Sequence, residues 1–246
     1  MKDNGLRKNQ AFKKNIRSIR VVNECRTQNL NLIKKGLAIH TFGNISSRIE
    51  KDFFVIKPSG INLSLTKAKN YPIVRISDAK IVSGKLHPSS DTPTHLFLYK
   101  HYTQIGAIAH SHSKYATAWS QACKPIPILG TTHADYAQKE IPITSPLKNS
   151  QIIKNYEHNT AVVIKKCLEK NNLNPLNCPG VLVRNHGPFC WGKNMKEAIN
   201  NCEILEYIAE LAYISISINE KSKVSKSLIN KHFIRKHGKN SYYGQK

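Results

Sequence analysis

IGAIAHSHSKYATAWSQAC, residues 105–123, decides the fold prediction, because this stretch changes from a strand pattern to a helix pattern. The small and apolar run 105–110 is typical of a buried strand, and 113–123 is typical of a helix that follows it. Along a strand, side chains two positions apart point to the same side, so the imidazoles of His110 and His112 can face one point. Paired histidines at a strand end either bind a metal or are simply hydrogen-bonded, and the spacing alone leaves both interpretations open.

Short apolar strands alternate with longer helices along the rest of the chain. We expect strands at 53–56 and 180–183, and a hairpin that joins 71–77 to 80–83 around Asp78 and Ala79. Gly36 is placed to end the first helix, and the segment 89–95 has the Ser, Asp, Thr and Pro residues that open another. The expected helices also include 16–35, 149–170, 195–218 and 222–236. This order predicts an α/β fold in which a mixed β-sheet is sandwiched between helices.

The 246 residues contain no internal repeat and no long linker, so they suit a single compact domain. We expect residues 1–20 to form a basic, flexible N-terminal extension and residues 21–246 to form that domain. No apolar run is long enough for a membrane span, and the polar start lacks the apolar core of a signal peptide, which favours a cytoplasmic protein. The six cysteines include no C-x-x-C pair, so we expect reduced thiols.

The formal net charge of +23 is the strongest compositional signal and raises nucleic-acid binding as a function. However, the lysines are spread from Lys2 to Lys246, and the sequence shows none of the common zinc-finger, RNP-like or basic-zipper patterns. We therefore expect nucleic acid not to be the main partner. Attraction of an anionic substrate is a more modest use of the charge.

A third histidine strengthens the metal interpretation. His186 follows the apolar strand 180–183, and ligands gather at strand ends in α/β sheets. Three histidines with one carboxylate, and coordination positions left for substrate, are typical of a catalytic zinc site, although Mn²⁺ or Co²⁺ can replace zinc at such ligands. The alternative is that His186 is an ordinary turn residue beside Gly187.

Two loop segments carry the groups that bind phosphate. Hydroxyls, a lysine and glycine-flanked backbone near a helix N-terminus can cradle an anion. A plain capping or turn role is the alternative for each segment. The candidate residues are Ser89, Ser90 and Asp91 in one segment, Lys57, Ser59 and Gly60 in the other, and Asn44 in a further loop.

Seven blocks together give a more specific signal than any one of them. The blocks are GNIS (43–46), IKPSG (56–60), SSDTPTH (89–95), HSH (110–112), GTTHADY (130–136), NHGPF (185–189) and RKHG…YYGQ (235–245). With these blocks in this order, the chain resembles the bacterial L-ribulose-5-phosphate 4-epimerases of the class II aldolase/epimerase superfamily, from about residue 27 to residue 245. The resemblance implies a class II aldolase-like fold and an isomerase that acts on a small phosphorylated pentulose.

The resemblance also assigns roles by position. It makes Asp135 and Tyr243 the acid/base pair, with Tyr243 reaching the site from a neighbouring subunit of a homotetramer. His232 and Arg235 match residues near that interface, and Glu157 matches a polar residue close to the site. The metal residues that it implies are Asp91, His110, His112 and His186, and the substrate residues are Gly43, Asn44, Lys57, Ser59, Gly60, Ser89 and Ser90.

The reaction implied is epimerisation of L-ribulose 5-phosphate to D-xylulose 5-phosphate at C4, by breaking and re-forming the C3–C4 bond with zinc as cofactor. The nearest alternative is an aldolase of the fuculose- or rhamnulose-phosphate type, which releases the two fragments. Those relatives typically place Glu at the position of Asp91 and lack the Tyr-Tyr-Gly end. A basic nucleic-acid-binding protein on the same scaffold is the other alternative, and it would have no use for the four metal residues.

Overall fold

The computed structural model describes residues 2–238 and 241–242, with side chains from Ser18 onward. Within this part of the chain seven strands form one sheet in the order β4-β3-β2-β1-β5-β7-β6. All pairings between these strands are antiparallel, and parallel pairing is limited to an isolated bridge between Ile143 and Leu182. The strands are β1 (Asn44–Ile49), β2 (Phe53–Ile56), β3 (Ile73–Arg75), β4 (Ile81–Ser83), β5 (Ala107–His110), β6 (Gly180–Val183) and β7 (Gly187–Gly192).

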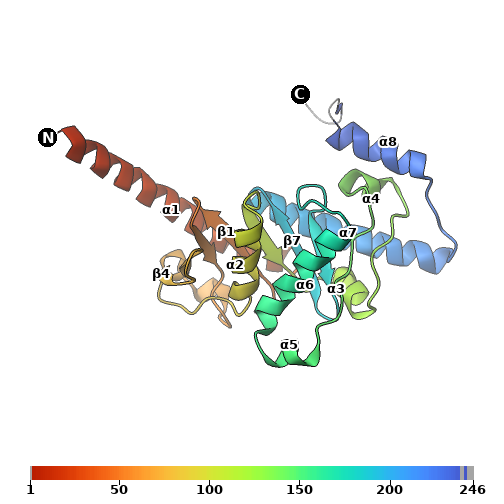
Figure 1. The fold of residues 1–246 in the computed structure, drawn as a ribbon, viewed down its shortest axis with the longest axis horizontal. Coiled ribbons are helices and arrows are strands. Elements are labelled where there is room, and N and C mark those ends of the chain that lie inside the picture. Colours follow the sequence, from red (N-terminus) through yellow and green to blue (C-terminus); the bar gives the residue numbers. More distant parts are fainter. Residues whose placement is uncertain (1, 239–240, 243–246) are drawn as a thin grey trace.

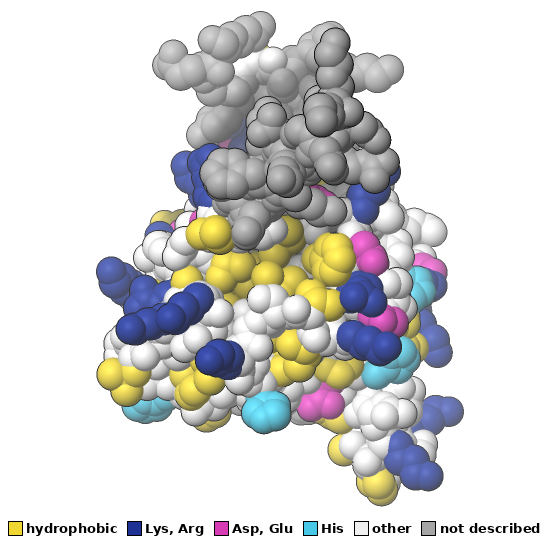
Figure 2. Space-filling model, turned by 90° about the vertical axis from the view of Figure 1, so that its left-hand side faces the viewer, with side chains coloured by type: hydrophobic (Ala, Val, Ile, Leu, Met, Phe, Trp, Pro, Cys, Tyr) yellow, Lys and Arg dark blue, Asp and Glu magenta, His cyan; other side chains and the backbone are white. Residues whose placement is uncertain are grey.

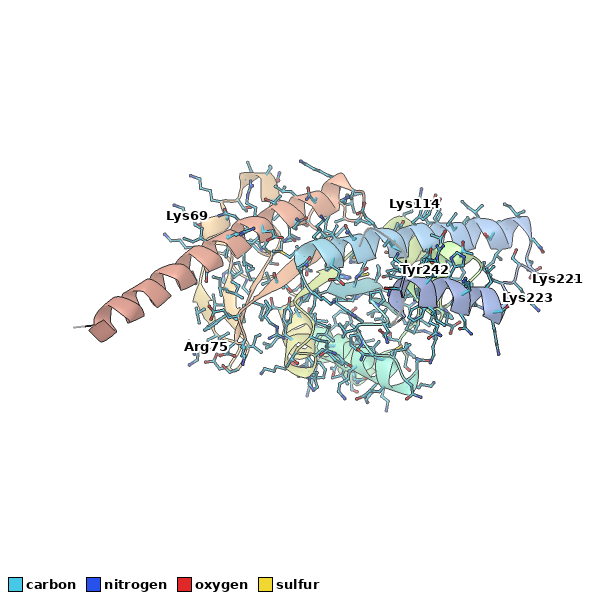
Figure 3. All side chains as sticks on the ribbon, turned by 90° about the horizontal axis from the view of Figure 1, so that it is seen from above. Lys69, Arg75, Lys114, Lys221, Lys223 and Tyr242 are labelled. Carbon is cyan, nitrogen blue, oxygen red and sulfur yellow. The ribbon has the colours of Figure 1, made fainter. Side chains whose placement is uncertain are left out.

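Helices cover both faces of the sheet, which confirms the predicted α/β sandwich (Figure 1). α1, α3 and α7 pack on one face, while α2 and α6 pack on the other. Figure 3 shows α1 and α7 on the same side of the molecule. The helices are α1 (Lys2–Lys34), α2 (Thr92–His101), α3 (Lys114–Gln121), α4 (Thr131–Tyr136), α5 (Asn149–Ile153), α6 (Tyr156–Lys170), α7 (Met195–Ile218) and α8 (Lys226–His237), with 3-10 turns at Leu63–Leu65 and Ala68–Asn70.

The alternation of side chains along β5 joins the two halves of the core. Ala107 and Ala109 belong to the apolar cluster under α1 and α7, whereas Ile108 belongs to the cluster under α2 and α6. Because side chains alternate between faces, His110 points to the same side as Ile108. The first predicted histidine therefore lies at the end of a buried strand, on the α2 and α6 side.

Several sequence expectations are confirmed and others differ from the structure. The hairpin β3–β4 and the helix Met195–Ile218 form as predicted, and Gly36 ends α1 with a left-handed φ of 68°. The expected continuous helix 149–170 is broken, because Asn155 takes the left-handed conformation (φ 57°) and α6 starts afresh at Tyr156. α1 begins at Lys2 rather than near residue 16, and the division into a flexible extension and a domain stays a prediction.

Basic side chains lie at both ends of the molecule. Lys69 and Arg75 lie towards one end of the molecule, and Lys221 and Lys223 lie at the other (Figure 3). Figure 2 views the end from which α1 extends and shows apolar side chains beside that helix. Ile19 of α1 and Ile73 of β3 line a shallow groove. None of the described helices is both long and apolar enough to cross a membrane.

Candidate metal centre and substrate cavity

The sheet topology brings two of the predicted histidines together. β5 and β6 run in the same direction, and β7 lies antiparallel between them. The C-terminal end of β5 and the β6–β7 turn therefore lie at the same end of the sheet. β5 ends at His110, and the turn carries His186 beside Asn185, whose φ of 59° is left-handed. Gly187 allows a close approach, since a Cβ there would lie 2.7 Å from the carbonyl oxygen of Ser111.

The three histidines form a compact group. Each of His110, His112 and His186 offers one ligand nitrogen, and these atoms lie within 4.8 Å of one another. The Nε2 atoms of His110 and His112 are 3.1 Å apart. The His110 ring stacks on Phe189, with 4.1 Å between the ring centroids. Among the described residues, this is the only group of three or more His, Cys, Asp and Glu side chains arranged in this way.

The protonation of these histidines suits a metal ligand set. Nδ1 of His110 donates to the carbonyl oxygen of Pro188 at 3.0 Å, which leaves the Nε2 lone pair facing His112. Burial lowers the pKa of His110 well below its usual value, and the neighbouring His186 and His112 lower it further. Burial also lowers the pKa of His112 and that of His186. Neutral imidazoles with convergent lone pairs are the form that binds a divalent ion, so the donor set fits a metal.

Asp91 lies beside the histidine group but is not one of its three members. It is the N-cap residue of α2, yet its side chain makes no capping bond. Its Oδ2 instead accepts a hydrogen bond from Nδ2 of Asn44 at 2.6 Å. The carboxylate is therefore not used by its own helix, and its role as a fourth ligand stays a prediction.

One cavity of about 330 Å³ collects all of the predicted metal residues and all of the predicted substrate residues. Three loops meet there: the loop before β1, the loop after β2 and the loop before α2. Ser59, Gly60 and Ser90 are exposed at the cavity, whereas Asn44 and Ser89 are buried beneath it. The lining consists of Thr41, Phe42, Gly43, Asn44, Lys57, Ser59, Gly60, Ser89, Ser90, Asp91, His110, His112, Tyr156, Glu157 and His186.

Lys57 is a structural part of this cavity. Its ammonium group is buried and donates to the carbonyl oxygens of Thr41 and Gly43. Burial lowers the pKa of Lys57 to about 8, while the Asp91 carboxylate acts in the opposite direction. Gly43 has a φ of 72°, and a Cβ there would lie 2.8 Å from the carbonyl oxygen of His110. Lys57 thus holds the loop before β1 against the end of β5.

Of the two predicted acid/base residues, Asp135 falls within the described part of the chain, and it does not join the histidines of that chain. Asp135, in α4, lines a separate cavity of about 340 Å³ with Trp191 and Phe233. Its carboxylate accepts from Nδ1 of His232 at 3.0 Å and from Nη2 of Arg235 at 2.7 Å. Tyr243 lies outside the described residues.

The hydrogen bonds of Asp135 set its charge. Partial burial raises the pKa of Asp135, but the hydrogen bonds and positive charges of Arg235 and His232 outweigh this and lower it overall. The carboxylate is therefore ionised and held to α8 within its own chain.

Tyr156 is a site residue that the sequence did not reveal. Its hydroxyl lies 3.0 Å from Nδ1 of His186, so it can fix the tautomer of that imidazole. The sequence pattern placed Tyr156 inside a longer helix. The only local signal is Asn155, because asparagine tolerates the left-handed conformation that restarts the helix here.

Comparison with known proteins agrees with this fold. Residues 24–213 match the class II aldolase and adducin N-terminal domain, and the chain therefore belongs to that family. It is similar to the solved structure of an L-fuculose 1-phosphate aldolase at 25% identity, with a TM-score of 0.72 and coverage of 87% of this chain and 94% of the other.

Two further structures share the fold. YgbL from Klebsiella pneumoniae, described as a putative aldolase/epimerase/decarboxylase, is 22% identical, with a TM-score of 0.66 and coverage of 86% and 97%. A sugar-phosphate aldolase from Thermotoga maritima is 19% identical, with a TM-score of 0.63 and coverage of 84% and 98%. At these identities the likeness concerns the fold alone.

Proposed function

We propose that this protein is an enzyme of the class II aldolase superfamily that interconverts L-ribulose 5-phosphate and D-xylulose 5-phosphate in the cytoplasm. The observation that carries the proposal is the single cavity that holds three histidines, Asp91 and the loops matched to phosphorylated-sugar binding. The order of the sequence blocks and the Asp at position 91 favour epimerisation over aldol release.

The metal residues are assigned from the donor set. His110, His112 and His186 would hold the ion with their neutral imidazoles, and Asp91 would add a carboxylate. A divalent ion bound there, Zn²⁺ by preference with Mn²⁺ or Co²⁺ as substitutes, supplies a Lewis acid for the negative charge that develops on the sugar oxygens. The carbonyl oxygen of Pro188 orients the ring of His110, and the hydroxyl of Tyr156 orients the ring of His186.

The substrate residues are assigned from the loops around the cavity. Ser59, Gly60 and Ser90 present hydroxyl and backbone donors at its open side and would bind the phosphate. Lys57 would act mainly by fixing the loop that carries Asn44. The excess of positive charge on the chain attracts an anionic sugar.

The chemistry requires two acid/base groups. The C4 proton of the substrate is not acidic, so inversion by simple deprotonation is not an easy route. Breaking the C3–C4 bond gives an aldehyde fragment, and rotation of that fragment before the bond re-forms inverts C4. The C4 oxygen then points in different directions before and after rotation, so one group must remove its proton on one side and another must return it on the other.

Asp135 and Tyr243 are our assignment for this pair. Asp135 lines a different cavity from the histidines of its own chain, which supports a site built from two subunits. A homotetramer in which α4 and the C-terminal segment of one subunit face the metal cavity of the next would meet this need.

Aldol cleavage is the second candidate function, because the chain is similar to an L-fuculose 1-phosphate aldolase. Incubation of the purified protein with L-ribulose 5-phosphate distinguishes the two. We expect D-xylulose 5-phosphate to accumulate without free glycolaldehyde phosphate. Stoichiometric release of an aldehyde would show that the protein is an aldolase and not an epimerase. Turnover of a deoxysugar 1-phosphate to lactaldehyde would show the same.

A further inference from the structure

Two buried polar atoms behind the metal cavity have no hydrogen-bond partner among the protein atoms. They are Oδ1 of Asn44 and Nε2 of His95. Asn44 is 1% exposed and His95 is fully buried. Burial of a polar atom without a hydrogen-bond partner is unfavourable, so two such atoms on the neighbouring elements β1 and α2 call for an explanation.

The two atoms have complementary chemistry. Nδ2 of Asn44 donates to Asp91, which fixes Oδ1 of the same amide as an acceptor. Nδ1 of His95 lies 2.7 Å from Oγ of Ser46, and this Oγ lies 2.8 Å from the hydroxyl of Tyr99. A phenol is a better donor than an aliphatic hydroxyl, so Tyr99 donates to Ser46 and Ser46 donates to His95. The neutral imidazole then carries its proton on Nε2, as a donor.

The backbone places the two residues at neighbouring positions of β1 and α2. Asn44 and Ser46 are two positions apart on β1 and point to the same face of the sheet. Asp91 and His95 are one helical turn apart in α2, and the His95 N–H donates to the Asp91 carbonyl at 3.1 Å. Asn44 is hydrogen-bonded to Asp91 and Ser46 is hydrogen-bonded to His95. These are two neighbouring side-chain hydrogen bonds between β1 and α2.

We propose that His95 is a positioning residue for Asp91: its Nε2–H binds a buried water molecule, that water donates to Oδ1 of Asn44, and the Asn44 amide is thereby held in one orientation towards the Asp91 carboxylate. The relay runs from Tyr99 through Ser46, His95, the water and Asn44 to Asp91. It rests on the proposed function only in taking Asp91 as a metal residue.

The tautomer of His95 is the first test. Nitrogen-15 NMR of the full-length protein, with the His95 signals assigned by their loss in His95→Gln, reports which nitrogen carries the proton. We expect an Nε2–H tautomer whose proton exchanges slowly with solvent. An Nδ1–H tautomer would overturn the proposal, because the imidazole could then offer no donor to the water.

Metal affinity is the second test, because it needs no sugar substrate. Chelator competition with Zn²⁺ should show an affinity about tenfold weaker for His95→Leu and a partial recovery for His95→Gln, which keeps an N–H donor. Tyr99→Phe removes only the first hydroxyl of the relay and should weaken binding by about two- to threefold. Tyr71→Phe is the matched control, since Tyr71 is a buried tyrosine in the core on the other face of the sheet.

A double-mutant cycle separates positioning from a general packing role. His95 also contacts Phe189, which stacks on His110, so loss of packing alone would weaken the metal site by another route. If His95 acts through Asp91, His95→Leu should have little further effect in an Asp91→Ala background. An undiminished effect in that background would overturn the relay. If the double-mutant cycle on metal affinity gives the expected result but the wild type has no epimerase activity, the relay is supported and the proposed reaction is wrong.

Discussion

The chemistry of single side chains in this protein is set by the groups behind them. Asp91 occupies the N-cap position of α2, but its carboxylate makes no capping bond and accepts a hydrogen bond from Asn44. Lys57 has an ammonium group but gives its hydrogen bonds to loop carbonyls. Burial keeps His110 neutral by lowering its pKa, and the carbonyl oxygen that accepts from its Nδ1 sets the orientation of the ring. Residue type therefore names the candidates, and the surrounding hydrogen bonds decide what each can do.

Tyr243 is the residue whose role is easiest to isolate. Tyr243→Phe removes one hydroxyl, and loss of an acid/base group typically costs about 100-fold or more in turnover. We expect kcat to fall by about this factor in both directions while the affinity for L-ribulose 5-phosphate changes little. The neighbouring Tyr242→Phe is the control, since Tyr242 is exposed on the described chain. Unchanged turnover in Tyr243→Phe would show that the assignment is wrong.

His133 makes the fold sensitive to acid. Burial lowers the pKa of His133 from 6.5 to about 4 in the folded protein, so the unfolded chain binds a proton more readily. Stability contributed by the neutral imidazole is complete at neutral pH, and it is lost progressively as the pH falls from about 6.5 to about 4. We expect the free energy of unfolding in urea to fall by about 2 kcal/mol more between pH 7 and pH 5 in the wild type than in His133→Gln. The same pH dependence in both proteins would contradict this account.

At the level of elements, the C-terminal helix is attached mainly through one acidic side chain. α8 contacts α4, and Asp135 of α4 binds both His232 and Arg235 of α8. The backbone carbonyl of Asp135 also accepts from Nε2 of His237 at 2.8 Å. α8 contributes no residue to the buried core, so these polar contacts position it.

Arg235→Ala should therefore loosen α8 without unfolding the domain. We expect hydrogen exchange in Lys226–His237 to accelerate by an amount equivalent to about 1–2 kcal/mol, with α7 unaffected. Arg75→Ala is the matched control, because it breaks an exposed pair with Asp78 in the β3–β4 hairpin. Equal exchange in α8 of wild type and Arg235→Ala would show that other contacts hold the helix.

The sequence predicted elements with a strong period and missed those set by contacts between distant segments. The local sequence pattern predicts the strand that ends at His110, the turn at His186 and the helix 195–218. Once the strands pair, the strand end and the turn bring the histidines together. The break at Asn155 was missed because the apolar spacing continues on both sides of it. The part played by Tyr156 was missed for the same reason, since its hydroxyl meets His186 only in the fold.

Pairing of strands was also beyond the local pattern. A mixed sheet was expected from the alternation of strands and helices, yet β7 returns directly beside β5 and every pairing between the named strands is antiparallel. The C-terminal ends of β5 and β6 still lie at the same end of the sheet. The predicted grouping of His110 and His186 therefore does not depend on the direction of β7.

At the scale of the whole molecule, the metal cavity and Asp135 are separate in one chain, and the proposed reaction needs them together. Mixing two inactive variants tests whether a second subunit joins them. If His112→Ala and Asp135→Asn proteins are mixed in equal amounts, dissociated and reassociated, random assembly should restore about a quarter of wild-type activity. Each variant treated alone is the control. No recovery, from mixed oligomers shown to form by mass, would place the site within a single subunit.

The proposed epimerisation depends on a divalent ion held by His110, His112 and His186. The most direct measurement is metal content together with epimerase activity on L-ribulose 5-phosphate, for wild type, His112→Ala and His101→Ala. His101 is exposed on α2 outside the cavity and serves as the control. We predict about one bound ion per chain in wild type and His101→Ala, and loss of both the ion and at least about 100-fold of the activity in His112→Ala. Full activity of the wild type after exhaustive dialysis against chelator, or of metal-free His112→Ala, would contradict the account.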